Sequence, residues 1–163
     1  MIRTAAYSDA WAIADIYNYY VINTTVTFDL ECVTPYKIAQ SIERCGKIGP
    51  YLVYEEDEVV VGYARVSSEF RERKACEQFV ESSIYLKNGF GGKGIGFQLY
   101  SALLSKIVPK YPLIMAGITL ANIPSIRLHE KCGFEKVSHF SESARKFGEW
   151  IDVGFWQKSL GDH

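Results

Sequence analysis

Net charge is nearly absent from this chain, and its absence argues against several classes of protein. The 18 Lys and Arg residues are balanced by 19 Asp and Glu residues, which leaves a net charge of −1. A nucleic-acid-binding protein would need a strong basic excess, so we expect no nucleic-acid partner. The chain also lacks an apolar run near the ~18 residues that cross a bilayer, and its N-terminus lacks an apolar signal core. We therefore expect no membrane partner and a cytoplasmic location.

Residues that bind metals are few and scattered. The sequence has no C-x-x-C pair, and its three histidines do not stand at zinc-ligand spacing from the four cysteines, which are Cys32, Cys45, Cys76 and Cys132. We expect free thiols and no metal. Hydrophobic residues, in contrast, make up 48% of the 163 residues, and no linker, repeat or low-complexity segment interrupts them. This composition predicts one folded domain that covers residues 1–163.

The apolar pattern predicts elements in the order β-α-α-β-β-β-α-β-α-β-β. A hairpin in the first half and alternating strands and helices in the second favour an α/β fold with a mixed (α+β) sheet. Residues 21–30 are expected to leave the first helix as a loop or an extended piece. Four helices are expected. The first starts at Ser8 or Asp9, the second runs from Thr34 to Gly46, the third from Gly94 to Val108, and the fourth from Pro124 to just before Gly133. The expected strands are Ile2–Ala5, Tyr51–Glu55, Val59–Val66, Phe79–Leu86, Leu113–Thr119, Phe134–Phe140 and Trp150–Lys158.

The most informative segment joins an apolar strand to a helix through a glycine-rich turn. Five glycines fall between Gly89 and Gly96, around the predicted start of the helix. Glycine lets the backbone approach a ligand closely, and the first turn of a helix offers unpaired N–H groups to an anion. The segment therefore predicts a phosphate-binding site.

Three phosphate-binding motifs compete for this segment. The P-loop, G-x-x-x-x-G-K-[ST], does not fit, because Gly94 follows Lys93 where a hydroxyl residue should stand. The dinucleotide fingerprint G-x-G-x-x-G matches residues 89–94 formally, but the acidic residue expected about 20 positions later is missing. The third motif is a pyrophosphate loop for coenzyme A.

The segment GGKGIG resembles the acyl-CoA loop of the GNAT acetyltransferase superfamily, Q/R-x-x-G-x-G/A, with Gly91, Gly94 and Gly96 at the motif positions. Gly91 stands where that motif has Arg or Gln, so we expect a weaker pyrophosphate contact, with Lys93 as a candidate substitute. Four longer blocks resemble the phosphinothricin N-acetyltransferase branch: IYNYYVINTTVTFDLE (16–31), ESSIYL (81–86), AGITLANIPSIRLHEKCGFEKVSHF (116–140) and KFGEWIDVGFWQKSL (146–160). The resemblance implies the GNAT fold, a strongly twisted sheet flanked by helices. It also implies acetyl-CoA as co-substrate, a small-molecule amine as acceptor, and a homodimer.

Glu81 is the candidate general base. It interrupts an apolar strand in which Glu is disfavoured, and period two places it on one face with Ser83 and Tyr85. Aromatic surroundings should raise the pKa of its carboxyl group, which suits a base. A structural ion pair with an arginine such as Arg71 is the alternative. The resemblance implies that this Glu is the base.

Two residues are candidates for protonating the leaving thiolate. The resemblance implies His129, where many superfamily members have Tyr; a packed histidine bonded to a backbone carbonyl is the alternative. Tyr85 supplies a second hydroxyl, unless it only packs in the core. For the coenzyme, the resemblance implies Asn122, which also suits a helix N-cap, and a strand edge that holds the pantetheine arm. The candidate coenzyme-binding residues are Ile84, Tyr85, Leu86, Gly91, Gly92, Lys93, Gly94, Ile95, Gly96, Phe97, Asn122 and Ser125.

An amino-acid acceptor carries a carboxylate, for which a guanidinium is the natural partner. Arg71 and Arg73 precede the strand that holds Glu81, and the resemblance implies a basic residue near them; a solvated surface pair is the alternative. Ala75-Cys76 stands where relatives tend to carry an aromatic residue, which leaves the exact substrate open. The candidate acceptor-binding residues are Phe28, Arg71, Arg73, Glu81 and Ser83.

These residues and the resemblance predict an enzyme that transfers acetyl directly from acetyl-CoA to the α-amine of a small amino acid or analogue. Phosphinothricin, methionine sulfone and methionine sulfoximine are the acceptors that the resemblance implies. Glu81 would accept the amine proton through water, and His129 or Tyr85 would assist departure of the thiolate. Two alternatives stay open. One is a GNAT enzyme for a protein N-terminus, polyamine or aminoglycoside, and the other is a CoA-binding module without turnover.

Overall fold

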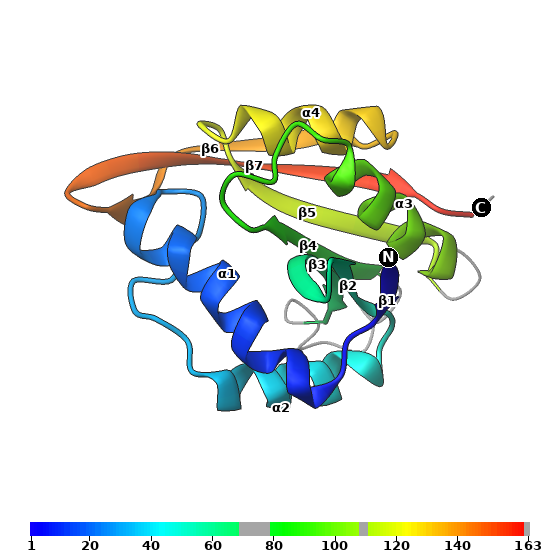
Figure 1. Cartoon of the computed structure of the whole chain (residues 1–163). Helices are drawn as coiled ribbons and strands as arrows, with labels where there is room; N and C mark the ends of the chain where they lie inside the picture. The colour runs from blue at the N-terminus through cyan, green and yellow to red at the C-terminus, as the bar shows by residue number, and fades with distance from the viewer. Residues whose placement is uncertain (69–78, 108–110, 162–163) are drawn as a thin grey trace.

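A computed structural model describes residues 1–68, 79–107 and 111–161, and the strands in these ranges form one sheet (Figure 1). The order of strands across the sheet is β1-β2-β3-β4-β5-β7-β6. Neighbouring strands are antiparallel, except that β4 and β5 run parallel. The predicted α/β class with a mixed sheet is confirmed. The strands are β1 (Ile2–Thr4), β2 (Tyr51–Glu56), β3 (Val59–Ser67), β4 (Phe79–Leu86), β5 (Leu113–Thr119), β6 (Glu135–Lys146) and β7 (Glu149–Ser159).

Helices cover both faces of the sheet (Figure 1). A short 3-10 turn, η1 (Tyr7–Asp9), leads into α1 (Ala10–Asn23), which lies with α2 (Pro35–Gly46) on one face. The opposite face carries α3 (Ile95–Ile107) and α4 (Ile123–Lys131). Each face buries its own apolar cluster, and burying one large apolar side chain contributes about 1.5–3 kcal/mol. The fully buried members include Ile13 and Val53 on the α1 side and Leu99, Leu103 and Ile114 on the α3 side.

Two helices begin at the caps that the sequence indicates. The Thr34 side chain accepts a hydrogen bond from the Lys37 backbone N–H at 3.2 Å, and Pro35 takes the first position of α2. The Asn122 side chain accepts one from the Ser125 backbone N–H at 3.3 Å. This second cap makes α4 begin almost directly after β5, beside the ends of the central strands.

Two elements, α1 and β6, extend furthest beyond their predicted bounds. α1 continues through Asn23, because Val21 is buried to 2% exposure and its packing outweighs the weak helix propensity of a β-branched residue. β6 was expected to end at Phe140 but runs to Lys146, across an irregular register between Phe140 and Ala144. The extra residues are polar and mostly exposed, so they lack the alternation that predicts a strand.

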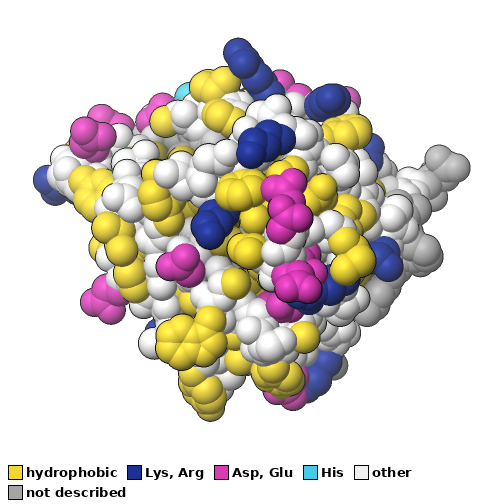
Figure 2. Space-filling model, in the orientation of Figure 1, with side chains coloured by type: hydrophobic (Ala, Val, Ile, Leu, Met, Phe, Trp, Pro, Cys, Tyr) yellow, Lys and Arg dark blue, Asp and Glu magenta, His cyan; other side chains and the backbone are white. Residues whose placement is uncertain are grey.

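None of the helices in the described residues is both long and apolar enough to span a membrane. On the face shown in Figure 2, basic and acidic side chains are interspersed, with apolar side chains between them. This mixture agrees with a net charge of −1. It gives that face no continuous basic track of the kind that follows a nucleic-acid backbone.

The parallel strands β4 and β5 separate part-way along their length. Their pairing ends at Glu81 and Met115, although both strands continue. Ser82 fastens the point of separation, since its hydroxyl donates to the Met115 carbonyl oxygen at 3.2 Å and lies 2.6 Å from the Tyr100 hydroxyl of α3. The strand edges that face each other beyond this point are therefore open to a ligand.

Candidate active site

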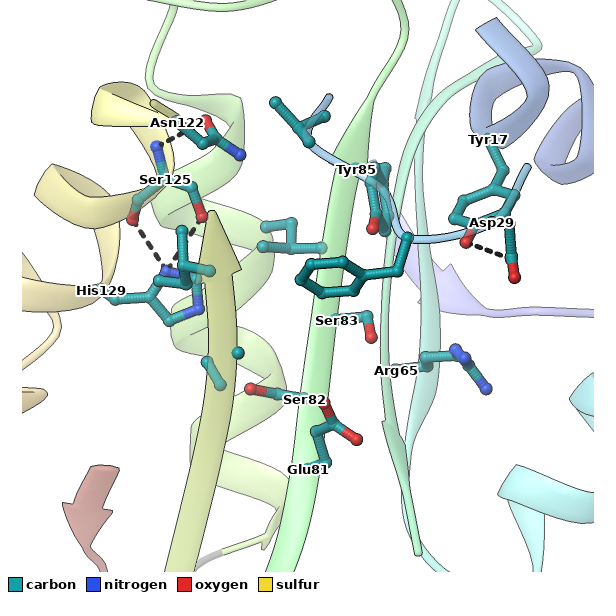
Figure 3. A pocket seen from close by; sticks show the side chains of 16 residues that line it. Tyr17, Asp29, Arg65, Glu81, Ser82, Ser83, Tyr85, Asn122, Ser125 and His129 are labelled. Carbon is teal, nitrogen blue, oxygen red and sulfur yellow. Dashed lines mark hydrogen bonds between the residues drawn. The ribbon is translucent and has the colours of Figure 1, made fainter. Parts of the chain in front are cut away.

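A cavity of about 420 Å³ opens where β4 and β5 separate (Figure 3). A volume of this size is within the range of small-molecule sites. Its walls come from the strands β3, β4 and β5, from α1 and the loop that follows it, and from α4 and its N-cap. The lining residues are Tyr17, Val26, Phe28, Asp29, Arg65, Glu81, Ser82, Ser83, Ile84, Tyr85, Ala116, Gly117, Ile118, Asn122, Ser125 and His129.

β4 presents Glu81, Ser83 and Tyr85 from one face, as strand alternation requires. Glu81 is the last residue of β4 that pairs with β5, so it lies at the closed end of the separation. Ser83 and Tyr85 follow along the open part (Figure 3). A carboxylate thus stands where the two strands meet, and two hydroxyl groups stand further along the same wall.

His129 lies in α4 and is buried to 2% exposure. Its Nδ1 is 2.8 Å from the Ser125 carbonyl oxygen, which only accepts hydrogen bonds, so Nδ1 carries the proton. The other nitrogen, Nε2, is buried and has no hydrogen-bond partner among the residues that the structure describes. Burial also lowers the pKa of the imidazole. The neutral ring therefore presents a lone pair, and not a proton, at Nε2.

Tyr85 lines the cavity and belongs to an aromatic cluster. Its ring meets Tyr17 edge-on at 5.1 Å between centroids and stacks on Tyr63 at 5.6 Å. Burial raises the pKa of the Tyr85 hydroxyl, so this group keeps its proton at neutral pH. Tyr85 can therefore donate a hydrogen bond to an anion in the cavity.

Two charged residues of this cavity were missed by sequence reasoning. Asp29, in the loop after α1, accepts a hydrogen bond from the Tyr17 hydroxyl at 2.5 Å. Arg65 comes from β3, and its Nη1 donates to the Ser41 hydroxyl of α2 at 3.1 Å. A lone arginine in an apolar strand was a usable signal for Arg65, whereas nothing local to Asp29 indicated where the fold would carry its loop.

The loop that carries Phe28 and Asp29 is fastened from the far end of the sheet. The Lys146 ammonium of β6 donates to the Thr27 hydroxyl at 3.0 Å and to the Thr27 carbonyl at 3.3 Å. Both residues are buried, and burial lowers the pKa of Lys146. The unpredicted extension of β6 thus fixes one wall of the cavity.

A second cavity of about 740 Å³ continues from the first along the glycine-rich turn. Their common wall consists of Val26, Ile84, Tyr85, Asn122 and Ser125. A single ligand can therefore extend through both cavities. The remaining lining residues are Tyr20, Leu86, Lys87, Asn88, Gly89, Gly91, Gly92, Gly94, Gly96, Phe97, Pro124, Arg127, Leu128 and Lys131.

The glycine-rich turn presents mainly backbone to the second cavity. Gly89, Gly92 and Gly94 have φ angles of 85°, 77° and 80°, which L side chains rarely adopt. Gly91 has no such constraint, and a Cβ at that position would meet no atom within 4 Å. α3 starts at Ile95, so the N–H groups of its first turn complete an anion site.

The charged residues that line the second cavity are all basic: Lys87, Arg127 and Lys131. The Lys131 ammonium lies 4.5 Å from the centroid of the Phe97 ring, which also lines the cavity. Two of the predicted coenzyme-binding residues lie beside the lining and not in it. The Lys93 ammonium rests 4.6 Å from the Phe90 ring centroid, and the Ile95 side chain is buried to 3% exposure. This cavity suits a long, negatively charged ligand.

Of the predicted acceptor residues, Phe28, Glu81 and Ser83 line the first cavity. Arg71 and Arg73 lie outside the described residues, as does Cys76. Cys32, Cys45 and Cys132 are free thiols. Within the ranges that the structure describes, no group of three His, Cys, Asp or Glu residues is placed to hold a metal ion.

Comparisons with known proteins agree on one family. A family model described as an acetyltransferase (GNAT) domain matches residues 2–154. The phosphinothricin N-acetyltransferase of Streptomyces viridochromogenes is 36% identical over 160 residues, which cover 98% of this chain and 87% of that protein. The L-methionine sulfoximine/L-methionine sulfone acetyltransferase of Salmonella typhimurium is 34% identical, over 99% of this chain and 95% of that protein. The solved structure of yncA from Salmonella typhimurium with its cofactor acetyl-CoA is similar at a TM-score of 0.95 and 33% identity, covering 100% and 95% of the two chains.

Proposed function

The chain belongs to the GNAT acetyltransferase family and is an N-acetyltransferase, and from this premise we propose that it acetylates the α-amine of a small amino acid or analogue. The names of its relatives support acceptors of the phosphinothricin, methionine sulfone or methionine sulfoximine type. One observation carries the proposal. The basic, glycine-lined cavity and the cavity that holds Glu81 share a wall. A thioester that reaches through the glycine-lined cavity therefore meets an amine bound beside Glu81.

Acetyl-CoA is the co-substrate in this proposal. Its pyrophosphate would lie on the backbone N–H groups before α3, where the lining charges are positive. Its pantetheine arm would follow the edge of β4 beyond Glu81, since β5 no longer pairs with that edge. The thioester carbon would then reach the cavity near Ile84 and Tyr85, which line both cavities.

The reaction proceeds by direct attack in a complex of both substrates. The neutral amine nitrogen attacks the thioester carbon, a C–N bond forms, and the C–S bond breaks to release the thiolate of coenzyme A. Glu81 accepts the proton that the amine loses, through a bound water. A half-buried carboxylate at the closed end of the cavity is suitably placed for this role, because most of the surrounding wall is uncharged.

We assign assistance to the leaving thiolate to Tyr85 and not to His129. The support comes from the protonation of each group. Tyr85 retains its hydroxyl proton and can donate a hydrogen bond to the sulfur as negative charge develops there. The proton of neutral His129 is held at Nδ1 by the Ser125 carbonyl, so donation from Nε2 would need the imidazolium that burial disfavours.

The Glu81→Gln variant tests the role of the base. We expect turnover to fall by about 10²–10⁴-fold, which is the usual contribution of a general base. Affinity for acetyl-CoA should stay unchanged, because the coenzyme cavity does not include Glu81. Thiol release from acetyl-CoA, measured with methionine sulfone across the pH range, gives the rate, and calorimetric titration gives the affinity. Full activity of Glu81→Gln at every pH would remove Glu81 from the mechanism.

The same thiol-release assay separates the alternative functions. A panel of amino acids, polyamines, aminoglycosides and N-terminal peptides is offered to the wild-type protein. Release with polyamines or peptides but not with amino acids would favour another GNAT acceptor. Binding of acetyl-CoA without thiol release for any amine would favour a non-catalytic module.

A further inference from the structure

Arg65 lines the first cavity, which we call the acceptor cavity, together with the carboxylates of Asp29 and Glu81. It stands on β3 directly opposite Ser83 of β4. Glu81 is two residues from Ser83 on the same face, so Arg65 and Glu81 are diagonal neighbours across the strand pair. Figure 3 shows the Arg65 side chain on the same side of β4 as Glu81 and Ser83.

The guanidinium of Arg65 is held in place by α2. Its Nη1 donates to the Ser41 hydroxyl at 3.1 Å and lies 3.3 Å from the Cys45 sulfur. Ser41 and Cys45 are buried, with 9% and 0% exposure, so they form a rigid support. A guanidinium presents its N–H donors in a planar fork, and a fixed plane is what bidentate binding of a carboxylate requires.

The positive charge of Arg65 acts on tyrosine hydroxyls in and around the acceptor cavity. Burial raises the pKa of four tyrosine hydroxyls, and the charge of Arg65 opposes that rise in each of them: Tyr17, Tyr51, Tyr63 and Tyr85. Two of these four, Tyr17 and Tyr85, line the cavity themselves. An anion bound there is therefore placed in the field of a cation whose side chain is partly withdrawn from water.

We propose that Arg65 binds the α-carboxylate of the acceptor and selects α-amino acids over amines that lack a carboxylate. This inference rests on the proposed function. The amine and carboxylate of an α-amino acid are attached to the same carbon, so one molecule can reach Glu81 through a water and Arg65 directly. Cross-strand diagonal neighbours are about 7–8 Å apart at Cα, which long side chains bridge. The carboxylate clamp is thereby assigned to β3, in addition to any role of the arginines in residues 69–78.

The test compares two acceptors that differ only in the carboxylate: methionine sulfone and its carboxamide. In the wild-type protein we expect kcat/KM to be higher for the amino acid. In Arg65→Gln we expect kcat/KM for the amino acid to fall by about 10- to 100-fold, mostly through KM, because a charge-assisted pair is lost. The carboxamide should change by less than about 3-fold. Arg65→Lys keeps the charge but loses the fork, and should show an intermediate loss.

Controls separate binding from folding. Melting temperature and acetyl-CoA affinity are measured for every variant, and Lys106→Gln removes an exposed positive charge at the end of α3 without touching the cavity. If Arg65→Gln is too unstable to assay, Arg65→Lys carries the same comparison. An equal loss for both acceptors would overturn the clamp and leave Arg65 a structural residue.

The outcome for the wild-type protein keeps the two proposals apart. If it acetylates neither compound nor any other amino acid, the proposed function fails and the clamp fails with it. If it acetylates methionine sulfone, while Arg65→Gln keeps the full preference for the amino acid, the clamp alone is wrong.

Discussion

Arg3 joins three elements through one guanidinium. It binds both carboxylate oxygens of Asp9, at 2.7 and 2.9 Å, and it also donates to Glu55 of β2. Asp9 is buried to 5% exposure and accepts a further bond from the Ala6 backbone N–H. The hydrogen bonds from Arg3, the largest influence, lower the pKa of Asp9. The ion pair between Arg3 and Asp9 thus holds the start of α1 against β1.

We expect Arg3→Gln to destabilise the protein by about 1–3 kcal/mol, because the Asp9 carboxylate is left without its main donor. A lowered pKa stabilises the fold above the ordinary pKa of Asp and loses that contribution as pH falls through the folded-state value. The difference from wild type should therefore shrink below about pH 4. Thermal melts at pH 7, 5 and 3 measure it. A difference that stays constant with pH would show that the ion pair is not its source.

Tyr85 and His129 are the two candidate donors of a proton or hydrogen bond to the leaving thiolate. We expect Tyr85→Phe to lower kcat by about 10-fold or more, since a donor aimed at developing charge is lost. His129→Gln should keep most of the turnover. If the imidazolium of His129 were the acid, kcat would decline as pH rises through its lowered pKa, so activity would already be falling below the ordinary pKa of histidine. A pH profile of kcat for both variants distinguishes the two residues, and a decline of that form in the wild-type profile would reverse the assignment.

Sequence reasoning reached the residues whose role follows from a local anomaly. Glu81 was singled out because a carboxylate interrupts an apolar strand, and Asn122 because it suits a helix cap. Arg65 is a similar anomaly in β3, but Arg71 and Arg73 are nearer to Glu81 in sequence and were the predicted carboxylate partners. Asp29 and Thr27 gave no local signal, since the loop that holds them is positioned by Lys146, far away in sequence.

Among the elements, the glycine-rich turn before α3 differs most from its motif. Gly91 stands where the motif has Arg or Gln, but the structure leaves room for either side chain: a Cβ there would meet nothing within 4 Å. The position also lines the coenzyme cavity. The turn therefore does not require a glycine at position 91, and a longer side chain would fit there.

We expect Gly91→Gln to lower the Kd for acetyl-CoA by about 2- to 10-fold, through one new hydrogen bond to the pyrophosphate. Gly92→Gln is the matched control, because its φ of 77° disfavours any side chain and should weaken binding. Calorimetric titration with acetyl-CoA measures both. An unchanged Kd for Gly91→Gln would mean that position 91 does not face the pyrophosphate.

Strands with one buried face were predicted closely, and the strand without one was not. β4 and β5 matched their expected ranges because apolar residues mark them. The second half of β6 has no such marking, and its pairing with β7 depends on a tight turn at Phe147 and Gly148, where both φ angles are positive. Non-local pairing of this kind is not encoded in the hydrophobic period.

At the scale of the whole molecule, the order of elements and the mixed sheet were predictable, but the position of the last strand was not. The hydrophobic pattern does not indicate that β7 inserts between β5 and β6, where it pairs antiparallel with β5. The homodimer that the resemblance implies stays a prediction. β6 is an edge strand, and Phe140 within it and Phe147 just after it are more than half exposed, which gives a second copy apolar side chains to cover.

The two cavities beside the separation of β4 from β5 differ in what lines them, since main-chain atoms dominate one and side chains dominate the other. The cavity that we assign to the coenzyme is lined largely by a strand edge, glycines and a helix start. The acceptor half is built from side chains contributed by the strands, two helices and a loop. Point mutations can thus change what is acetylated while the acetyl donor stays the same. Such an arrangement lets the acceptor pocket change in sequence while the binding of the acetyl donor is kept.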